Sequence, residues 1–334
     1  MNQSKSMPKK QVVVMGGGNG SSISLCALKE HLDLFDISAV TSMVDSGYST
    51  GAMRKKFGML PPGDIMRASV SMSIYPYKIL KPIFYKNRTS TLEKLNTELK
   101  AERGPSLGNL FLLFASQYEG DFIKALRALE ETVEAVGHAY PSTVEQSELV
   151  VELTNGDMIQ SETKIDEPEY NRDLKIKKAW LEPEVSAYEE ALKKIREADY
   201  IIFGPGDLYT SIVASLLPKG IYEAIAESKA HLTYVVGNAY HTEGETGPEK
   251  LSDFILELEN YLPRKLDHII YNNAELSLEQ SAIYVQRKWS LVEQDVISSD
   301  DLRIVEGNYE RTGGGLCPEK LGEIFKQLAY NCNI

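Results

Sequence analysis

The chain has 334 residues, of which 43% are hydrophobic and 25% charged, and its formal net charge is −12. This length exceeds what one small core usually spans, so we expect a single large α/β domain over residues 11–330 that carries an insertion. The acidic balance excludes a general nucleic-acid or membrane-surface binder, because binding to a polyanion requires a basic face.

The cysteines and the first residues bear on where the protein works. Cys26, Cys317 and Cys332 lack the paired spacing of a zinc site, so we interpret them as reduced thiols. No apolar run is long enough to span a bilayer, and residues 1–10 lack the apolar segment of a signal peptide. We therefore expect a cytoplasmic protein with no membrane partner and no nucleic-acid partner, whose residues 1–10 form a disordered tail.

The first 45 residues predict a strand–helix–strand unit. QVVVM (11–15) is a β-branched run that ends at glycine, which is typical of a buried parallel strand. SSISLCALKEHL (21–32) has apolar residues at helical spacing and opens with serines that can cap a helix. ISAVTSMV (37–44) predicts the next strand, and this order begins a doubly wound sheet.

The middle of the chain predicts a helical insertion and a β-hairpin. Residues 64–136 are mostly helical in pattern and include a basic, aromatic patch at 75–88. We interpret this patch as a helix with buried rings and solvated lysines, and leave open a protein-interaction surface. Residues 147–163 form two strand-like runs around Asn155-Gly156, a strong hairpin signal. A strand at 176–182 and an amphipathic helix at 185–198 follow.

The C-terminal half predicts three more strands, and each ends in small or amide residues. They lie within residues 199–212, 231–241 and 266–276. Because the carboxyl ends of parallel strands share one edge of a sheet, we expect a ligand site there. The helix N-termini that follow such strands favour anions.

A glycine loop, GGGNGSS (16–22), follows the first strand. The dinucleotide pattern GxGxxG would need glycine at Ser21, and the Walker pattern would need a lysine that is absent. Backbone amides together with Asn19 and the serines can still hold phosphate oxygens. Taken alone, a tight turn without a ligand explains the loop equally well. A second loop of this kind, GPGDLYTS (204–211), ends another strand, and Gly237-Asn238 and Asn272-Asn273 add amides at the same expected edge.

Three polar residues have competing interpretations. Asp45 follows the second strand, where a carboxylate can hold a ribose hydroxyl or Mg²⁺, although a helix-capping role is favoured for the loop alone. Asp64 in PPGD is best interpreted as the N-cap of the next helix. Asn109 in SLGN is either a satisfied core amide or a ligand contact. The five histidines lack metal-ligand spacing, and none supports a catalytic triad.

Together, the motifs GGGNG, DSGYSTG, LPPGDI, SLGNL and GPGDLYTS resemble one family, from about Val12 to Leu328. This family comprises CofD-like proteins, among them the bacterial gluconeogenesis factors and, more distantly, the 2-phospho-L-lactate transferases. The resemblance implies a Rossmann-related three-layer α/β/α fold with a mostly parallel sheet. For the gluconeogenesis-factor branch it implies a UDP-sugar ligand such as UDP-N-acetylglucosamine. For the transferase branch it implies a guanosine diphosphate conjugate with Mg²⁺ and a deazaflavin acceptor.

The resemblance also implies roles for particular residues. Asp45 falls at the acidic position that the transferase branch uses for metal or acceptor, with Asp64 as a second catalytic candidate. Tyr284 matches a tyrosine linked to nucleotide-sugar binding. The nucleotide contacts would come from both glycine loops and from nearby hydroxyl and amide side chains: Gly17, Gly18, Asn19, Gly20, Ser21, Ser49, Asn109, Gly204, Pro205, Gly206, Asp207, Leu208, Ser211 and Asn238.

The chain departs from the family pattern at several of these positions. Ser46 replaces a second acid, Ala52 replaces an arginine, and Asp207 replaces a serine beside the expected phosphate. An Ile-Arg-His-Asp stretch usual after Leu316 is missing. These losses weaken a metal-dependent mechanism and remove an arginine that would pair with pyrophosphate. We therefore expect a regulatory nucleotide-sugar-binding protein, a homodimer like its relatives, linked to central carbon metabolism and to cell-wall or cell-shape control. The alternative is a Mg²⁺-dependent transferase that moves a phosphoester-linked group from a nucleoside diphosphate conjugate.

Overall fold

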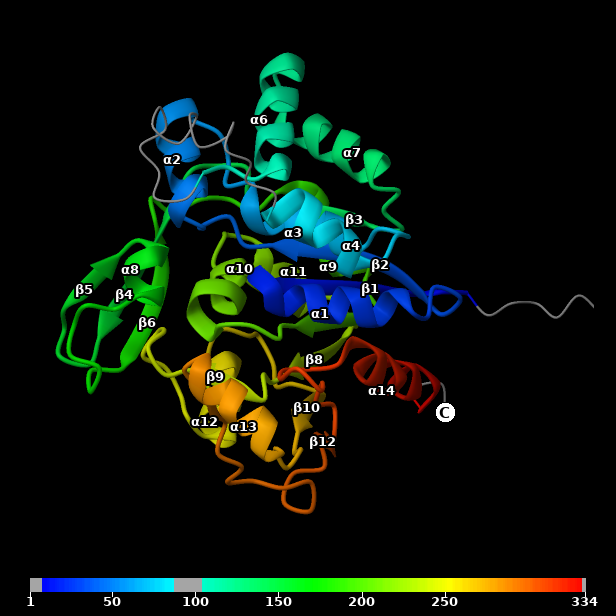
Figure 1. The fold of residues 1–334 in the computed structure, drawn as a ribbon, viewed down its shortest axis with the longest axis vertical. Coiled ribbons are helices and arrows are strands. Elements are labelled where there is room, and N and C mark those ends of the chain that lie inside the picture. The colour runs from blue at the N-terminus through cyan, green and yellow to red at the C-terminus, as the bar shows by residue number, and fades with distance from the viewer. Residues whose placement is uncertain (1–7, 87–103, 332–334) are drawn as a thin grey trace, which may run out of the picture.

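The computed structural model describes residues 8–86 and 104–331, and its centre is a seven-stranded sheet (Figure 1). The strand order is β12-β10-β8-β7-β1-β2-β3, and all neighbouring pairs are parallel. The expected parallel sheet is therefore confirmed. Its strands are β1 (Lys10–Gly16), β2 (Phe35–Thr41), β3 (His138–Pro141), β7 (Tyr200–Phe203), β8 (His231–Val235), β10 (His268–Asn272) and β12 (Ile304–Gly307).

Helices cover both faces of this sheet, which makes the three expected layers. Alternate residues of β1 enter different cores: Val12 and Val14 pack into one, and Val13 and Met15 into the other. Because a strand buried on both faces needs apolar side chains on both, its sequence is a continuous apolar run, as in QVVVM. One layer contains α1 (Gly18–Lys29), α3 (Gly63–Ser71), α6 (Leu107–Glu119), α7 (Phe122–Thr132) and α14 (Pro318–Asn331), and the other α9 (Glu189–Glu197), α11 (Ile221–Glu227) and α12 (Leu251–Glu259).

A smaller antiparallel sheet of order β5-β4-β6 stands beside the main one (Figure 1). β4 (Glu148–Leu153) and β5 (Met158–Gln160) form the predicted hairpin, and Gly156 at its turn has a φ of +90°. The strand expected at 176–182 is β6 (Ile176–Glu182), which pairs with β4. The short helix α8 (Glu162–Asp166) follows β5 and brings two carboxylates toward the main sheet.

The structure corrects the expected start of the first helix. α1 begins at Gly18, and its N-cap is Gly17, which has no capping side chain. The hydroxyls of Ser21 and Ser22 donate back to the carbonyls of Gly17 and Gly18, at 3.0 and 3.3 Å. Serine hydroxyls commonly bond the preceding turn in this way inside a helix. The two serines therefore do not cap α1.

The loop expected at Asp45 after the second strand leads directly into the helix α2 (Tyr48–Phe57), which no sequence pattern had indicated. The expected helical region 64–136 contains α3, α4 (Tyr77–Lys81), the π-helical turn η1 (Pro82–Lys86), α6 and α7, while residues 87–103 lie outside the described part. α3 packs directly on β2 and β3, so it belongs to a sheet layer. Of the expected disordered tail, residues 1–7 are not described, and Lys10 already belongs to β1. Within the described ranges, no helix is both long and apolar enough to cross a membrane.

Candidate functional site

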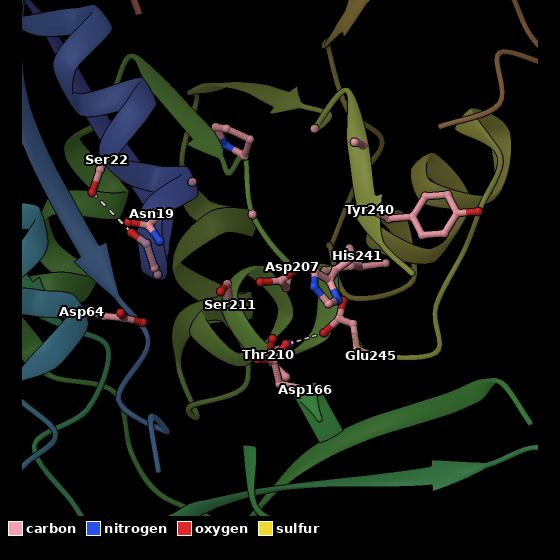
Figure 2. Close-up of a pocket in the computed structure, with 18 of the residues that line it drawn as sticks. Asn19, Ser22, Asp64, Asp166, Asp207, Thr210, Ser211, Tyr240, His241 and Glu245 are labelled. Carbon is pink, nitrogen blue, oxygen red and sulfur yellow. Dashed lines mark hydrogen bonds between the residues drawn. The ribbon is translucent and has the colours of Figure 1, made fainter. Parts of the chain in front are cut away.

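The two glycine loops meet at the carboxyl edge of the sheet, because β1 and β7 are neighbours. A Cβ atom added at Gly20 would lie 2.0 Å from the carbonyl oxygen of Pro205, so only glycine fits this contact. The Ser24 hydroxyl donates to the Gly204 carbonyl at 2.7 Å. Gly18 and Gly206 line one cavity of about 1560 Å³, as predicted for two loops that follow parallel strands at the same edge of a sheet. Figure 2 shows Asn19 and Asp64 on one side of this cavity, His241 and Glu245 on the other, and Asp207 and Ser211 between them.

The first loop presents the N-terminus of α1 to this cavity. Gly17, Gly18, Asn19 and Gly20 all line it, whereas the backbone-bonded Ser21 does not. Because no side chain caps Gly17, the first amides of a 12-residue helix remain for a ligand. Such amides carry partial positive charge and favour anions.

Arg67 places a positive charge beside this loop. Its Nη1 lies 3.8 Å from Asp64 Oδ1 and 3.8 Å from where a Cβ of Gly18 would stand. The guanidinium stacks over the ring of Tyr85 at 4.3 Å, and its Nε donates to the Tyr85 hydroxyl. Arg67 was not among the residues predicted from the sequence, although its spacing from Asp64 in LPPGDIMR places both on one face of a helix.

Asp64 itself is not the helix cap that the sequence favoured. α3 begins at Gly63 with Pro62 as N-cap, so Asp64 lies in the first turn. Its side chain faces the first loop, because a Cβ at Gly17 would lie 2.6 Å from Asp64 Oδ2. Asp64 therefore lines the cavity between the loop and Arg67.

The second loop differs from a simple phosphate cradle. η2 (Leu208–Val213) follows it, and the Glu245 carboxylate accepts the amides of Tyr209 at 3.0 Å and Thr210 at 2.9 Å. The chain's own carboxylate therefore occupies the amides that a phosphate was expected to take. Pro205, Gly206, Asp207, Leu208 and Ser211 still line the cavity, while Gly204 is turned away from it.

Half-buried carboxylates from separate elements face the same cavity. Burial, and then the neighbouring Asp64, raise the pKa of Asp45 to about 6. Burial and Asp45 raise the pKa of Glu162 to about 8, and burial and Asp207 raise that of Asp166 to about 7. Burial also raises the pKa of Glu245 to about 8. These raised pKa values mean that some of the carboxyl groups lining the cavity are protonated near neutral pH.

Both interpretations of Asp45 find support in its contacts. Its Oδ1 accepts the amide of Gly47 at 2.9 Å, so it satisfies a backbone donor just before α2, although no side chain caps that helix. Asp45 also lines the cavity, and a Cβ at Gly63 would lie 2.6 Å from its Oδ2. Among the described residues no group of three or more Asp, Glu, His or Cys is placed to hold a metal. Mg²⁺ commonly uses one or two carboxylates together with phosphate and water, so the Mg²⁺ prediction stays a prediction.

Asn109 is not a fully satisfied core amide. Its Nδ2 donates to the Ser49 hydroxyl at 3.3 Å, but its buried Oδ1 has no partner among the described residues. Both residues line the cavity. Buried polar atoms normally have partners, so the free oxygen favours the ligand-contact interpretation.

The far end of the cavity is built from the C-terminal third of the chain. Asn238, Arg311 and Gly315 line it together with Trp289 of β11 (Trp289–Leu291), which pairs with β9 (Ala239–His241). The guanidinium of Arg287 stacks on the Trp289 ring at 4.8 Å. Tyr284 of α13 (Leu278–Gln286) does not line the cavity: its side chain is buried and its hydroxyl donates to Glu310.

The raised carboxyl pKa values predict that the protein loses stability as the pH rises from about 4.5 to 8. Glu162 keeps its proton to about pH 8 when folded, whereas an unfolded glutamate releases it near 4.5. The folded state thus holds more protons in this window, so the stability present below the unfolded pKa is lost as pH passes through the folded pKa. Urea unfolding at pH 5.5 and pH 8 measures the difference.

Glu162→Gln should reduce this pH dependence, because it removes one titrating group. Glu152→Gln is the control, since Glu152 is on β4, which contacts α8, and pairs with the exposed Lys177 at 2.8 Å. An unchanged pH dependence in Glu162→Gln would show that Glu162 is ionised at neutral pH.

Fold and site define a Rossmann-like α/β protein with a ligand cavity over the carboxyl ends of its central strands. The family model described as 2-phospho-L-lactate transferase CofD matches residues 12–309. The chain is 34% identical to a candidate gluconeogenesis factor of Thermotoga maritima, covering 85% of this chain and 86% of that one. It is 30% identical to the gluconeogenesis factor of Bacillus subtilis, with 85% and 83% covered. A crystal structure of a Bacillus halodurans protein superposes with a TM-score of 0.82 at 29% identity, covering 96% of this chain and all of that one. The chain belongs to the CofD family.

Proposed function

We propose that this protein binds a UDP-sugar in the cavity and acts as a regulator of the gluconeogenesis-factor type. The observation that supports this most is the contact between the glycine loops, which brings the open N-terminus of α1 and Arg67 to one place. Together they offer amide hydrogens and a guanidinium, the donors that a diphosphate requires. The relatives named as gluconeogenesis factors support a role in central carbon metabolism, and the proposal extends this role to cell-wall or cell-shape control.

The cavity also has room for the rest of such a ligand. With the diphosphate at the start of α1, one end of the ligand extends toward Asn238 and Trp289. The carboxylates of Asp166 and Asp207 line the part between, where they can accept hydroxyl hydrogens from a sugar. The proposal includes a cytoplasmic location and a homodimer, and sedimentation of the purified protein measures the latter.

Binding without turnover is favoured by the contacts of Ser46, which stands where relatives carry a second acid. Its hydroxyl lies 2.9 Å from both Ser161 Oγ and Thr163 Oγ1. The residue therefore ties the loop after β2 to the start of α8 and brings no carboxylate of its own to the cavity.

Calorimetry tests the proposal directly. UDP-N-acetylglucosamine, UDP-glucose, GDP and ADP are titrated into the folded protein, and binding of a UDP-sugar is expected in the micromolar range typical of metabolite sites. Lack of binding by every nucleotide at millimolar concentration would overturn it.

The transferase is the second candidate, because Asp45 has the properties of a general base. Its raised pKa of about 6 and its position beside Asp64 suit proton removal from an acceptor hydroxyl near neutral pH. Asp45→Asn should then lower turnover by about 10²- to 10⁴-fold while the protein stays folded. The measurement is release of nucleoside monophosphate from a nucleoside diphosphate conjugate in the presence of Mg²⁺.

Asp36→Asn is the matched control for this experiment. Asp36 is at the other end of β2, where its carboxylate accepts from the exposed Gln11 side chain at 2.9 Å. Equal turnover in wild type and Asp45→Asn would remove the base assignment, and no turnover in wild type would favour the regulatory function.

A further inference from the structure

A buried carboxylate, Glu310, connects the far end of the cavity to three elements of the sheet and its helices. The side chain is 5% exposed. Its oxygens accept from Asn272 Nδ2 at 2.8 Å, from the Gly315 amide at 2.8 Å and from the Tyr284 hydroxyl at 3.1 Å. Asn238 Nδ2 is a fourth donor. No motif in the sequence points to Glu310.

These contacts fix the orientation of the Asn238 amide. Both hydrogens of its Nδ2 are used on the protein side, one on Glu310 and one on the Tyr284 hydroxyl oxygen. A flipped amide would place Oδ1 against a carboxylate, with two acceptors facing each other and no proton between them. The charge of Glu310 therefore selects one of the two amide orientations.

The selected orientation leaves one atom of Asn238 for a ligand. Within the described part of the chain, no donor reaches its Oδ1, and Asn238 lines the cavity. Asn272 differs, because its Oδ1 accepts the Tyr309 amide at 2.7 Å and it does not line the cavity. Position 238 thus presents a hydrogen-bond acceptor.

The ring of Trp289 lines the same end of the cavity, with the Arg287 guanidinium stacked on one of its two faces. It meets Tyr284 edge-on at 5.4 Å, and a Cβ at Gly315 would lie 3.9 Å from Trp289 Cζ3. Glu310 therefore holds Asn238 directly and the Trp289 end through Tyr284 and Gly315. An aromatic face beside one fixed acceptor suits a planar ring that carries an N–H.

We propose that Glu310 is a positioning residue that makes Asn238 a fixed acceptor for the ring N–H of a nucleobase. The cavity then favours a base whose ring nitrogen is protonated, as in uracil, over one whose ring nitrogen is an acceptor, as in cytosine. Tyr284 acts through Glu310 and Asn238 and not by touching the ligand. This inference rests on the proposed nucleotide-binding function and names the base chemistry of that same site.

The test compares the affinities of UDP, CDP and 3-methyluridine diphosphate by calorimetry. The third probe keeps the uracil ring but has a methyl group in place of the N–H. Wild type should bind UDP about tenfold or more tightly than either of the others, because an unmatched buried acceptor is costly. Glu310→Gln should bring the ratio of the UDP affinity to each of the other two affinities close to one. The neutral glutamine no longer selects one orientation of the Asn238 amide.

Two further variants keep the result interpretable. Glu306→Gln makes the same change on β12, where Glu306 accepts from the Asn273 side chain and the Ser298 amide, and it should leave the ratio unchanged. Asn238→Leu keeps a similar side-chain shape, removes the acceptor and leaves Glu310 with three donors. If Glu310→Gln fails to fold, Asn238→Leu therefore tests whether the Asn238 oxygen sets the preference for UDP. A merely structural role for Glu310 would lower all three affinities equally and keep the ratio.

The outcomes separate the two proposals. Equal binding of all three probes by wild type, or a ratio that survives in both Glu310→Gln and Asn238→Leu, overturns the inference and leaves nucleotide binding standing. Absence of binding by every probe overturns both.

Discussion

Replacing Gly20 with alanine is expected to destabilise the folded protein by about 3 kcal/mol and to abolish nucleotide binding. The added Cβ would lie 2.0 Å from the Pro205 carbonyl oxygen and 2.5 Å from its carbon. Both are backbone atoms of the second loop, so no side-chain rotation can relieve the clash. The two loops must separate, which opens the place where the diphosphate is proposed to bind. Chemical denaturation and UDP calorimetry measure the two effects.

Gly313→Ala is the matched control. No atom lies within 4 Å of its added Cβ, and its φ is outside the left-handed region. Its free energy of unfolding should stay within about 0.5 kcal/mol of wild type, as for most exposed substitutions. If Gly20→Ala behaved like this control, the two loops would not be in contact in solution.

Replacing Arg67 with methionine is expected to weaken diphosphate binding by about 100-fold, because a hydrogen bond to a charged group contributes about 1.5–3 kcal/mol. Arg67 is the cation that the structure places against Gly18, and its removal also leaves the Asp64 carboxylate unneutralised beside the ligand. Like charges then face each other at the binding site. The affinity of Arg67→Lys for the diphosphate should lie between those of wild type and Arg67→Met. Lysine keeps the charge but lacks the planar guanidinium that can donate two parallel hydrogen bonds.

The comparison of UDP with uridine separates binding from folding in this experiment. Arg67→Met should lose affinity for UDP and change little for uridine, which has no phosphate. Lys78→Met, an exposed lysine on α4 outside the cavity lining, should alter neither. An equal loss for UDP and uridine would mean that Arg67 only supports the fold.

Much of the sheet and the location of the site could be predicted because their signals are local. Continuous β-branched runs identify β1 and β7 as buried strands, and Asn155-Gly156 identifies the hairpin. Glycines at the ends of two parallel strands share one edge of the sheet wherever the connections run. The loops at 16–20 and 204–207 were therefore expected to meet, and the contact between Gly20 and Pro205 confirms that they do.

The chemistry around the loops could not be predicted in the same way. Arg67, Glu162 and Glu245 come from separate elements, and their roles depend on which side chains meet across the cavity. Glu245 reaches the amides of Tyr209 and Thr210 from the GET segment at 244–246, whose sequence does not indicate this contact. α2 was missed because YSTGAMRKKF begins with residues that favour loops, and the burial of Met53 in the core could not be foreseen from the sequence.

The pairing of β1 with β7 sets when the site can exist during synthesis of the chain. Gln11 donates its amide to Asp199 across 188 positions of sequence. A ribosome adds these residues in roughly 10–40 s, during which the first loop has emerged without its partner. A nucleotide that binds as proposed can therefore protect the N-terminal half from proteases only once the second loop has left the exit tunnel.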